Sequence, residues 1–168
     1  SPPARVRPSW TGTYRNFDND GSSMKFHFLG DRTERAFTRG QRHLERWSFD
    51  EAVQAFDFAI ESDPAYSHLH MHKGLALAEL GRFQDAVNAI ERAGQLQPTN
   101  FVFPMYSGCI HLDEGHTAAA AQAFAKAAAL APTNSLLSSY RLLADYAGGD
   151  KQALRKLAPT VVQTPDGF

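Results

Sequence analysis

The sequence predicts an all-α solenoid, because one pattern is written three times along its central part. Three residue types recur at one common spacing: Pro64, Pro98 and Pro132; Ala52, Ala86 and Ala120; Gly40, Gly74 and Gly108. Agreement between independent residue types on one period is the signature of a repeat array. We therefore predict three helix-turn-helix repeats at 33–66, 67–100 and 101–134, followed by a degenerate fourth unit or capping helix with a tail at 135–168.

The middle copy, 67–100, shows why each unit is a pair of helices. Apolar residues recur at helical spacing before the Gly81-Arg82 step and again after it: Leu69, Leu77, Leu80, Phe83, Val87 and Ile90. Small residues let the two backbones approach closely, and Pro98 cannot continue the second helix. One such hairpin cannot bury its apolar face, so neighbouring copies must stack.

The pattern resembles the tetratricopeptide repeat family, with Phe56, Ile90 and Phe124 in the family's aromatic position. Its departures from the family pattern fall on three bulky positions: Ala36, His70 and Pro104 replace Trp; Arg39, Lys73 and Ser107 replace Leu; His43, Leu77 and His111 fill the Tyr position. The missing bulk predicts looser packing between the paired helices. The resemblance implies a non-catalytic array whose first helices line a concave, peptide-binding groove.

The N-terminal segment, 1–32, differs in composition from the repeats. Segments 11–17 and 23–29 are rich in Thr, Tyr and Phe, and a turn sequence at 18–21 separates them, which predicts a β-hairpin. We expect residues 11–29 to pack on the array. The chain begins at Ser1 rather than Met, which suggests processing or excision from a longer chain.

The remaining elements are expected in chain order. Helices are predicted over 32–46, from 49 onward, and over 67–80, 83–96, 101–114, 117–130 and 135–146, with a short last helix at 151–157. Ser48 with Glu51 has the spacing of a capping box at the start of the second helix. The capping helix offers the third repeat an apolar face made of Leu136, Leu137, Tyr140, Leu143 and Ala144.

Composition limits the function classes. Hydrophobic residues make up 43% of the chain, and 17 basic against 18 acidic residues give a net charge of −1. This balance gives no electrostatic footprint for nucleic acid or an anionic membrane. The sequence contains no run of about 18 apolar residues that could span a bilayer. We expect a soluble chain, cytoplasmic or exported after processing, and the single cysteine does not decide the compartment.

Candidate chemical sites have simpler interpretations. On a helix only His68 and His72 of the 68–72 histidine trio share a face, and no third metal ligand has a supporting spacing. Asp18 to Gly21 is a turn rather than a calcium loop, because Leu29 stands where a bidentate Glu is needed. Cys109 has no neighbouring base. The sequence predicts no enzyme activity, cofactor or metal.

The resemblance places a set of side chains in the concave groove: Phe37, Gln41, Glu45, His68, Met71, His72, Leu75, Glu79, Val102, Met105, Tyr106, Cys109 and Asp113. Its centre is apolar, and its methionines can repack around a hydrophobic anchor. Glu45, Glu79 and Asp113 share the repeat spacing and form an acidic row along one edge. We expect Met71 to be open to water and to contact the partner. Alternatively, part of the groove packs against the chain's own terminal segments.

The sequence therefore predicts a protein-interaction module that binds a peptide or helix carrying apolar and basic residues. One alternative is a homo-oligomeric scaffold, in which a terminal segment of one copy docks in the groove of the next. Another is the recruiting or regulatory domain of a larger enzyme. The Lys, Asn and Arg clamp with which some family members grip chaperone C-termini is absent at the corresponding positions, which argues against that role.

Overall fold

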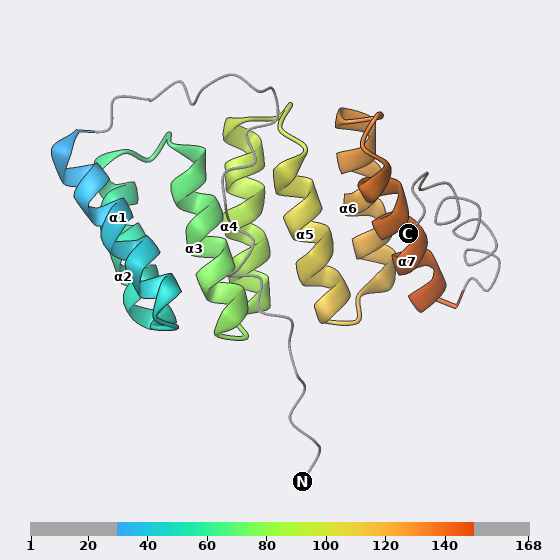
Figure 1. Ribbon diagram of the computed structural model, residues 1–168, viewed down its shortest axis with the longest axis horizontal. Coiled ribbons are helices and arrows are strands. Elements are labelled where there is room, and N and C mark those ends of the chain that lie inside the picture. Colours follow the sequence, from blue (N-terminus) through green and yellow to red (C-terminus); the bar gives the residue numbers. More distant parts are fainter. Residues whose placement is uncertain (1–29, 150–168) are drawn as a thin grey trace, which may run out of the picture.

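The computed structural model describes residues 30–149, which form a row of paired helices (Figure 1). Seven helices lie in this part of the chain: α1 (Asp31–Glu45), α2 (Phe49–Ser62), α3 (Ser67–Glu79), α4 (Phe83–Leu96), α5 (Val102–Asp113), α6 (Thr117–Leu130) and α7 (Ser135–Ala147). Their bounds lie within a residue or two of the predicted ones. The predicted hairpin and the predicted last helix fall outside the described residues.

The helices pack as three consecutive pairs and a cap. α1 packs on α2, α3 on α4 and α5 on α6, and each second helix also packs against the first helix of the next pair. α7 packs on α6, and the first helices α1 and α3 also contact each other. Figure 1 shows the pairs standing side by side along the long axis of the molecule. The predicted all-α solenoid with a capping helix is confirmed.

Glycine allows the helices of a pair to come close together. A Cβ atom added to Gly40 would lie 2.5 Å from the ring of Phe56, and one on Gly108 would lie 2.7 Å from the ring of Phe124. Both rings are fully buried. Any larger residue would push the aromatic ring out of its place, so the recurring glycine is explained by packing within each pair.

The turns inside the pairs share one backbone geometry. Gly81 and Gly115 have φ angles of 75° and 80°, and the equivalent position in the first pair is Trp47, with φ 61°. The predicted capping box at Ser48 is wrong, because its side chain makes no capping hydrogen bond. Its ψ of 71° lies outside the extended range from which a serine hydroxyl normally caps a helix.

The capping helix buries less than predicted. Leu137 and Ala144 are fully buried, and the ring of Tyr140 stacks on Phe124 with 5.2 Å between ring centroids. Leu136 and Leu143 are exposed instead. At about 3.6 residues per turn these two leucines lie beside the buried stripe rather than on it. α7 therefore closes the array with a narrow apolar stripe.

Candidate functional site

Three first helices bring the predicted groove side chains together, but to different depths. Five are buried: Met71, His72, Leu75, Val102 and Cys109. Six are half-buried: Phe37, Gln41, His68, Glu79, Met105 and Tyr106. Glu45 and Asp113 are exposed. The expectation that Met71 is open to water is wrong, because its side chain is only 8% exposed and belongs to the main hydrophobic cluster.

Aromatic rings connect α1 with α3 in this region. The Phe37 ring meets the imidazole of His72 edge-on with 5.1 Å between centroids, and Phe56 stacks on the same imidazole at 5.6 Å. Tyr66 contacts Phe37 edge-on at 6.3 Å and stacks on His68 at 5.2 Å. Sequence reasoning missed Tyr66, because it precedes α3 and therefore lies outside the helical spacing that selected the other groove residues.

His72 is a buried polar group in the middle of this aromatic region. Desolvation, with a smaller contribution from His68, lowers the pKa of His72 to about 3. The imidazole is therefore neutral at neutral pH. Its Nδ1 atom has no hydrogen-bond partner among residues 30–149. A buried polar atom without a partner is uncommon in folded proteins and costs stability.

Two predicted groove residues of α5, Cys109 and Tyr106, are also shielded from water. Burial raises the pKa of the Cys109 thiol to about 12, with a further contribution from the negative charge of Asp113. The pKa of Tyr106 rises to about 12 for the same principal reason, burial. Both groups keep their protons at neutral pH, so the thiol lacks the ionisation that a nucleophile needs. No group of three His, Cys, Asp or Glu residues in the described range could hold a metal ion.

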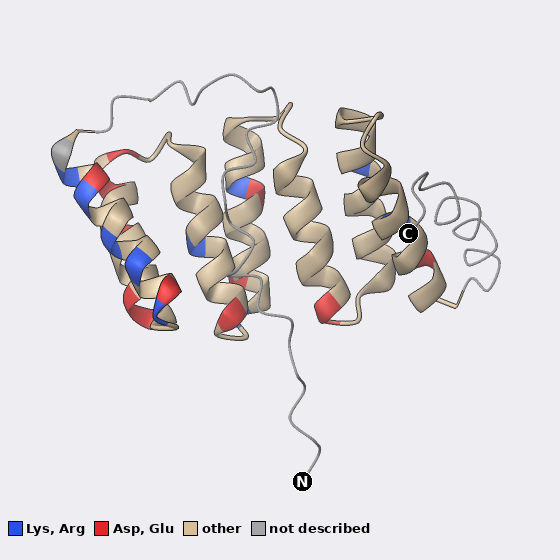
Figure 2. Cartoon of the chain, in the orientation of Figure 1, with Lys and Arg blue, Asp and Glu red and all other residues tan. Residues whose placement is uncertain are grey.

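The acidic row lies where the first helices end. Glu45, Glu79 and Asp113 are the last residues of α1, α3 and α5. Figure 2 shows acidic positions along the lower edge of the array at these helix ends. The repeat spacing thus places three carboxylates at equivalent positions in successive pairs.

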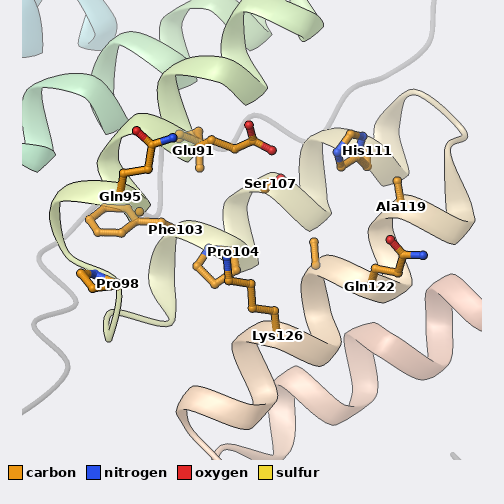
Figure 3. A pocket seen from close by; sticks show the side chains of 13 residues that line it. Glu91, Gln95, Pro98, Phe103, Pro104, Ser107, His111, Ala119, Gln122 and Lys126 are labelled. Atoms are coloured by element: carbon orange, nitrogen blue, oxygen red, sulfur yellow. The ribbon is translucent and has the colours of Figure 1, made fainter.

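A hollow of about 540 Å³ lies on the face of α5 that is opposite the predicted groove residues (Figure 3). We call it the α4–α6 hollow, because α4 and α6 form its walls. It is lined by Ile90, Glu91, Gly94, Gln95, Pro98, Phe103, Pro104, Ser107, His111, Ala119, Gln122, Ala123 and Lys126. At about 3.6 residues per turn, Phe103, Ser107 and His111 point away from the groove residues of the same helix. The sequence analysis does not predict this hollow.

The equivalent place one repeat earlier carries larger side chains, Lys73 and Ile60. We call the α2–α3 contact the first junction and the α4–α5 contact the second junction. In the first junction, Lys73 Nζ lies 2.6 Å from Asp57 Oδ1, and His70 Nε2 lies 2.9 Å from the carbonyl oxygen of Pro64. Ile60 of α2 packs against the main hydrophobic cluster. The looser packing predicted between the paired helices concerns a different contact and stays a prediction.

The same positions in the second junction carry smaller side chains. Ser107 stands one repeat after Lys73, and Gly94 stands one repeat after Ile60. Glu91 stands one repeat after Asp57 and also carries a carboxylate. No lysine or arginine of residues 30–149 forms an ion pair with Glu91. A Cβ atom added to Gly94 would have only an ordinary contact, 3.7 Å from the Cβ of Phe103.

A sequence model of the tetratricopeptide repeat family matches residues 37–100. The observed stack of paired helices agrees with this match. Residues 37–100 are thus identified as tetratricopeptide repeats. Among curated protein sequences, none matches the chain. No helix in the described part of the chain combines the length and the apolar character needed to cross a membrane.

Solved structures share the fold at low sequence identity. MamA (41-end) from Desulfovibrio magneticus RS-1 is 22% identical with a TM-score of 0.72, over 82% of this chain and 78% of that one. The TPR2B domain of yeast Sti1, solved as a complex with pHsp70, is 19% identical with a TM-score of 0.61, over 76% and 99%. The Yersinia enterocolitica chaperone SycD, solved with a peptide of the translocator YopD, is 15% identical with a TM-score of 0.64, over 71% and 97%.

Proposed function

We propose that the chain is a non-catalytic interaction module that binds a peptide or helix in the concave groove of α1, α3 and α5. The observation that carries the proposal is the pairing of a half-buried apolar row with an acidic edge. Phe37, Met105 and Tyr106 are partly accessible, and Glu45 and Asp113 are exposed at the helix ends. Such a surface suits a partner with apolar anchors and basic residues.

The two classes of groove residue have different tasks in this proposal. The five buried side chains form a rigid floor, and the half-buried ones make the contacts with the partner. Apolar anchors of the partner gain affinity by removing the remaining accessible area of Phe37, Met105 and Tyr106 from water. The acidic edge supplies orientation and faster association rather than most of the affinity.

Two of the structural neighbours support peptide binding by this fold, since they were solved with a peptide of YopD and with pHsp70. At 15% and 19% identity they support the mode of binding and not the identity of the partner. The mode itself is common: an amphipathic helix or extended segment places its apolar residues in a groove between helices.

The experiment is a selection of random displayed peptides on the immobilised chain, followed by calorimetry of the selected peptides. We expect them to combine apolar anchors with Lys or Arg. Met105→Glu should weaken their binding by roughly tenfold or more, because an anchor would have to desolvate the new charge. The matched control is Gln54→Glu, which adds the same charge at an exposed position of α2. Equal binding by wild type and Met105→Glu would contradict the proposal.

The acidic edge is tested separately with Glu45→Lys. We expect weaker binding of the basic peptides and a smaller dependence of their affinity on salt, because a screened attraction has been removed. Glu51→Lys, at an exposed position of α2, makes the same change of charge away from the groove. If both variants reduce affinity equally, the effect comes from net charge and the acidic row has no special part.

A further inference from the structure

The second junction lacks a lysine that the first junction has, and its carboxylate remains. In the first junction the stem of Lys73 crosses from α3 to α2, and its ammonium group pairs with Asp57 at 2.6 Å. In the second junction the lysine position is Ser107 and the carboxylate position is Glu91. The Lys73–Asp57 pair thus shows, one repeat earlier, how a lysine side chain can reach a carboxylate at this place.

We propose that the α4–α6 hollow is a binding site for a lysine side chain presented by a partner protein. The aliphatic stem would lie over Pro104, which is half-buried and lines the hollow beside Ser107. The ammonium group would reach the Glu91 carboxylate, as that of Lys73 reaches Asp57. Lysine stems commonly cover apolar surface in this way while the charged end meets a carboxylate or water.

The space and the charge in the hollow fit this occupant. Gly94 in place of Ile60 and Ser107 in place of Lys73 remove two long side chains from the same place. Figure 3 shows Glu91 with Ser107 and His111 along one part of the hollow, and Lys126 on the α6 wall away from them. Lys126, the lysine that lines the hollow, therefore does not occupy the position proposed for the partner's ammonium group.

His111 does not neutralise the carboxylate. Its pKa is lowered first by burial and then by His116, whose ring lies 6.2 Å away, while Glu91 and Glu114 act in the opposite direction. The imidazole is thus predominantly neutral at neutral pH and is not a counter-ion for the Glu91 side chain. The hollow lies on the face of α5 opposite the concave groove, so this proposal is independent of peptide binding there.

The experiment uses the whole chain and a short capped peptide with one central lysine among alanines. Its control peptide carries norleucine, which has the same stem without the ammonium group. Backbone amide shifts in NMR titrations report the position of binding. We expect the lysine peptide to shift the amides of Gly94, Ser107 and Ala123 and to bind roughly two- to fivefold more tightly than the norleucine peptide, the factor that a partly exposed ion pair supplies.

Glu91→Gln should abolish the preference for lysine while leaving the fold intact, because Glu91 is exposed. Ser107→Lys should fill the hollow from within: it should raise the melting temperature more than the uncharged Ser107→Met does, and it should remove peptide binding. The proposal is overturned if wild type shows no preference for lysine, or if Glu91→Gln retains the preference. Shifts confined to amides near Glu45, Glu79 and Asp113 would place the lysine on the acidic row and would also overturn it.

Discussion

The two junctions of this array share a backbone frame but are filled differently. In the first junction, the Lys73–Asp57 ion pair joins successive pairs, and Ile60 of α2 packs against the main hydrophobic cluster. In the second junction, Gly94 and Ser107 leave a hollow of about 540 Å³. A repeat period therefore fixes where helices lie, because that depends on a few small and aromatic positions. It leaves open how the space between pairs is used, since the other positions vary from copy to copy.

The largest expected effect on stability comes from the equivalent buried residues Phe56 and Ile90. Phe56→Ala should cost about 3–5 kcal/mol of unfolding free energy, because it empties a fully buried site against Gly40 and His72. Ile90→Ala should cost less, since isoleucine is smaller than phenylalanine and Ile90 lines the existing hollow. Denaturant titration of both variants measures the difference. An equal or larger loss for Ile90→Ala would show that the hollow does not weaken the second junction.

Acid should act on the first half of the array through His72. The folded pKa of His72 is about 3, below the ordinary value of 6.5, so the unfolded chain binds a proton that the folded chain does not. Its contribution to stability is present above pH 6.5 and is lost as the pH falls towards 3. We expect this group to remove roughly 2 kcal/mol between pH 7 and pH 5.

The equivalent residue in the third repeat is Tyr106, which does not titrate in that range. His72→Leu should therefore flatten the dependence of the unfolding free energy on pH between 7 and 5. Denaturant unfolding at several pH values measures it. If the variant and the wild type lose stability with the same slope, His72 is not protected from protonation in the folded chain.

Two glycines should respond in opposite directions to the same substitution. Gly108→Ala should destabilise by about 1–3 kcal/mol, because its Cβ would lie 2.7 Å from the buried ring of Phe124. Gly94→Ala should stabilise by roughly 0.5–1 kcal/mol, because the hollow has room for a methyl group and alanine favours helix. Thermal unfolding of the two variants tests both signs, and destabilisation by Gly94→Ala would mean that the hollow is tighter than its volume suggests.

The smallest effect is expected at the ion pair of the first junction. The side chains of Lys73 and Asp57 are 29% and 47% exposed, so their attraction is partly screened by water. Lys73→Met keeps most of the stem and removes the charge, and it should cost about 0.2–1 kcal/mol. A double-mutant cycle with Asp57→Asn isolates the pair. A coupling energy of zero would mean that the stem alone fills the junction.

The sequence was sufficient for the fold because the decisive residues repeat. Glycine in the first helix, alanine in the second helix and proline after it recur once in every copy, so periodicity alone predicts the helices and their order. The depth of the groove was not predictable in the same way. The spacing that puts Met71 on a given helix face does not tell how closely the neighbouring helices approach it.

The hollow was partly visible in the sequence. Pro104 and Ser107 stand where the family has Trp and Leu, so the sequence indicates missing bulk there, whereas Gly94 lies outside the family pattern. Only the packing shows that Gly94 and Ser107, from different helices, remove side chains from one place. Tyr66 and the unpartnered Nδ1 of His72 likewise depend on contacts between elements, and no local pattern encodes such contacts.

The buried thiol of Cys109 has a practical consequence for following motions of the array. It is the chain's only cysteine and lies in the second hydrophobic cluster with Ala120, Phe124 and Ala144. Burial keeps it protonated, so an alkylating reagent modifies it only when α5 separates from α6 and α7. The labelling rate therefore measures the local opening of the C-terminal end of the array under native conditions, and no cysteine has to be introduced.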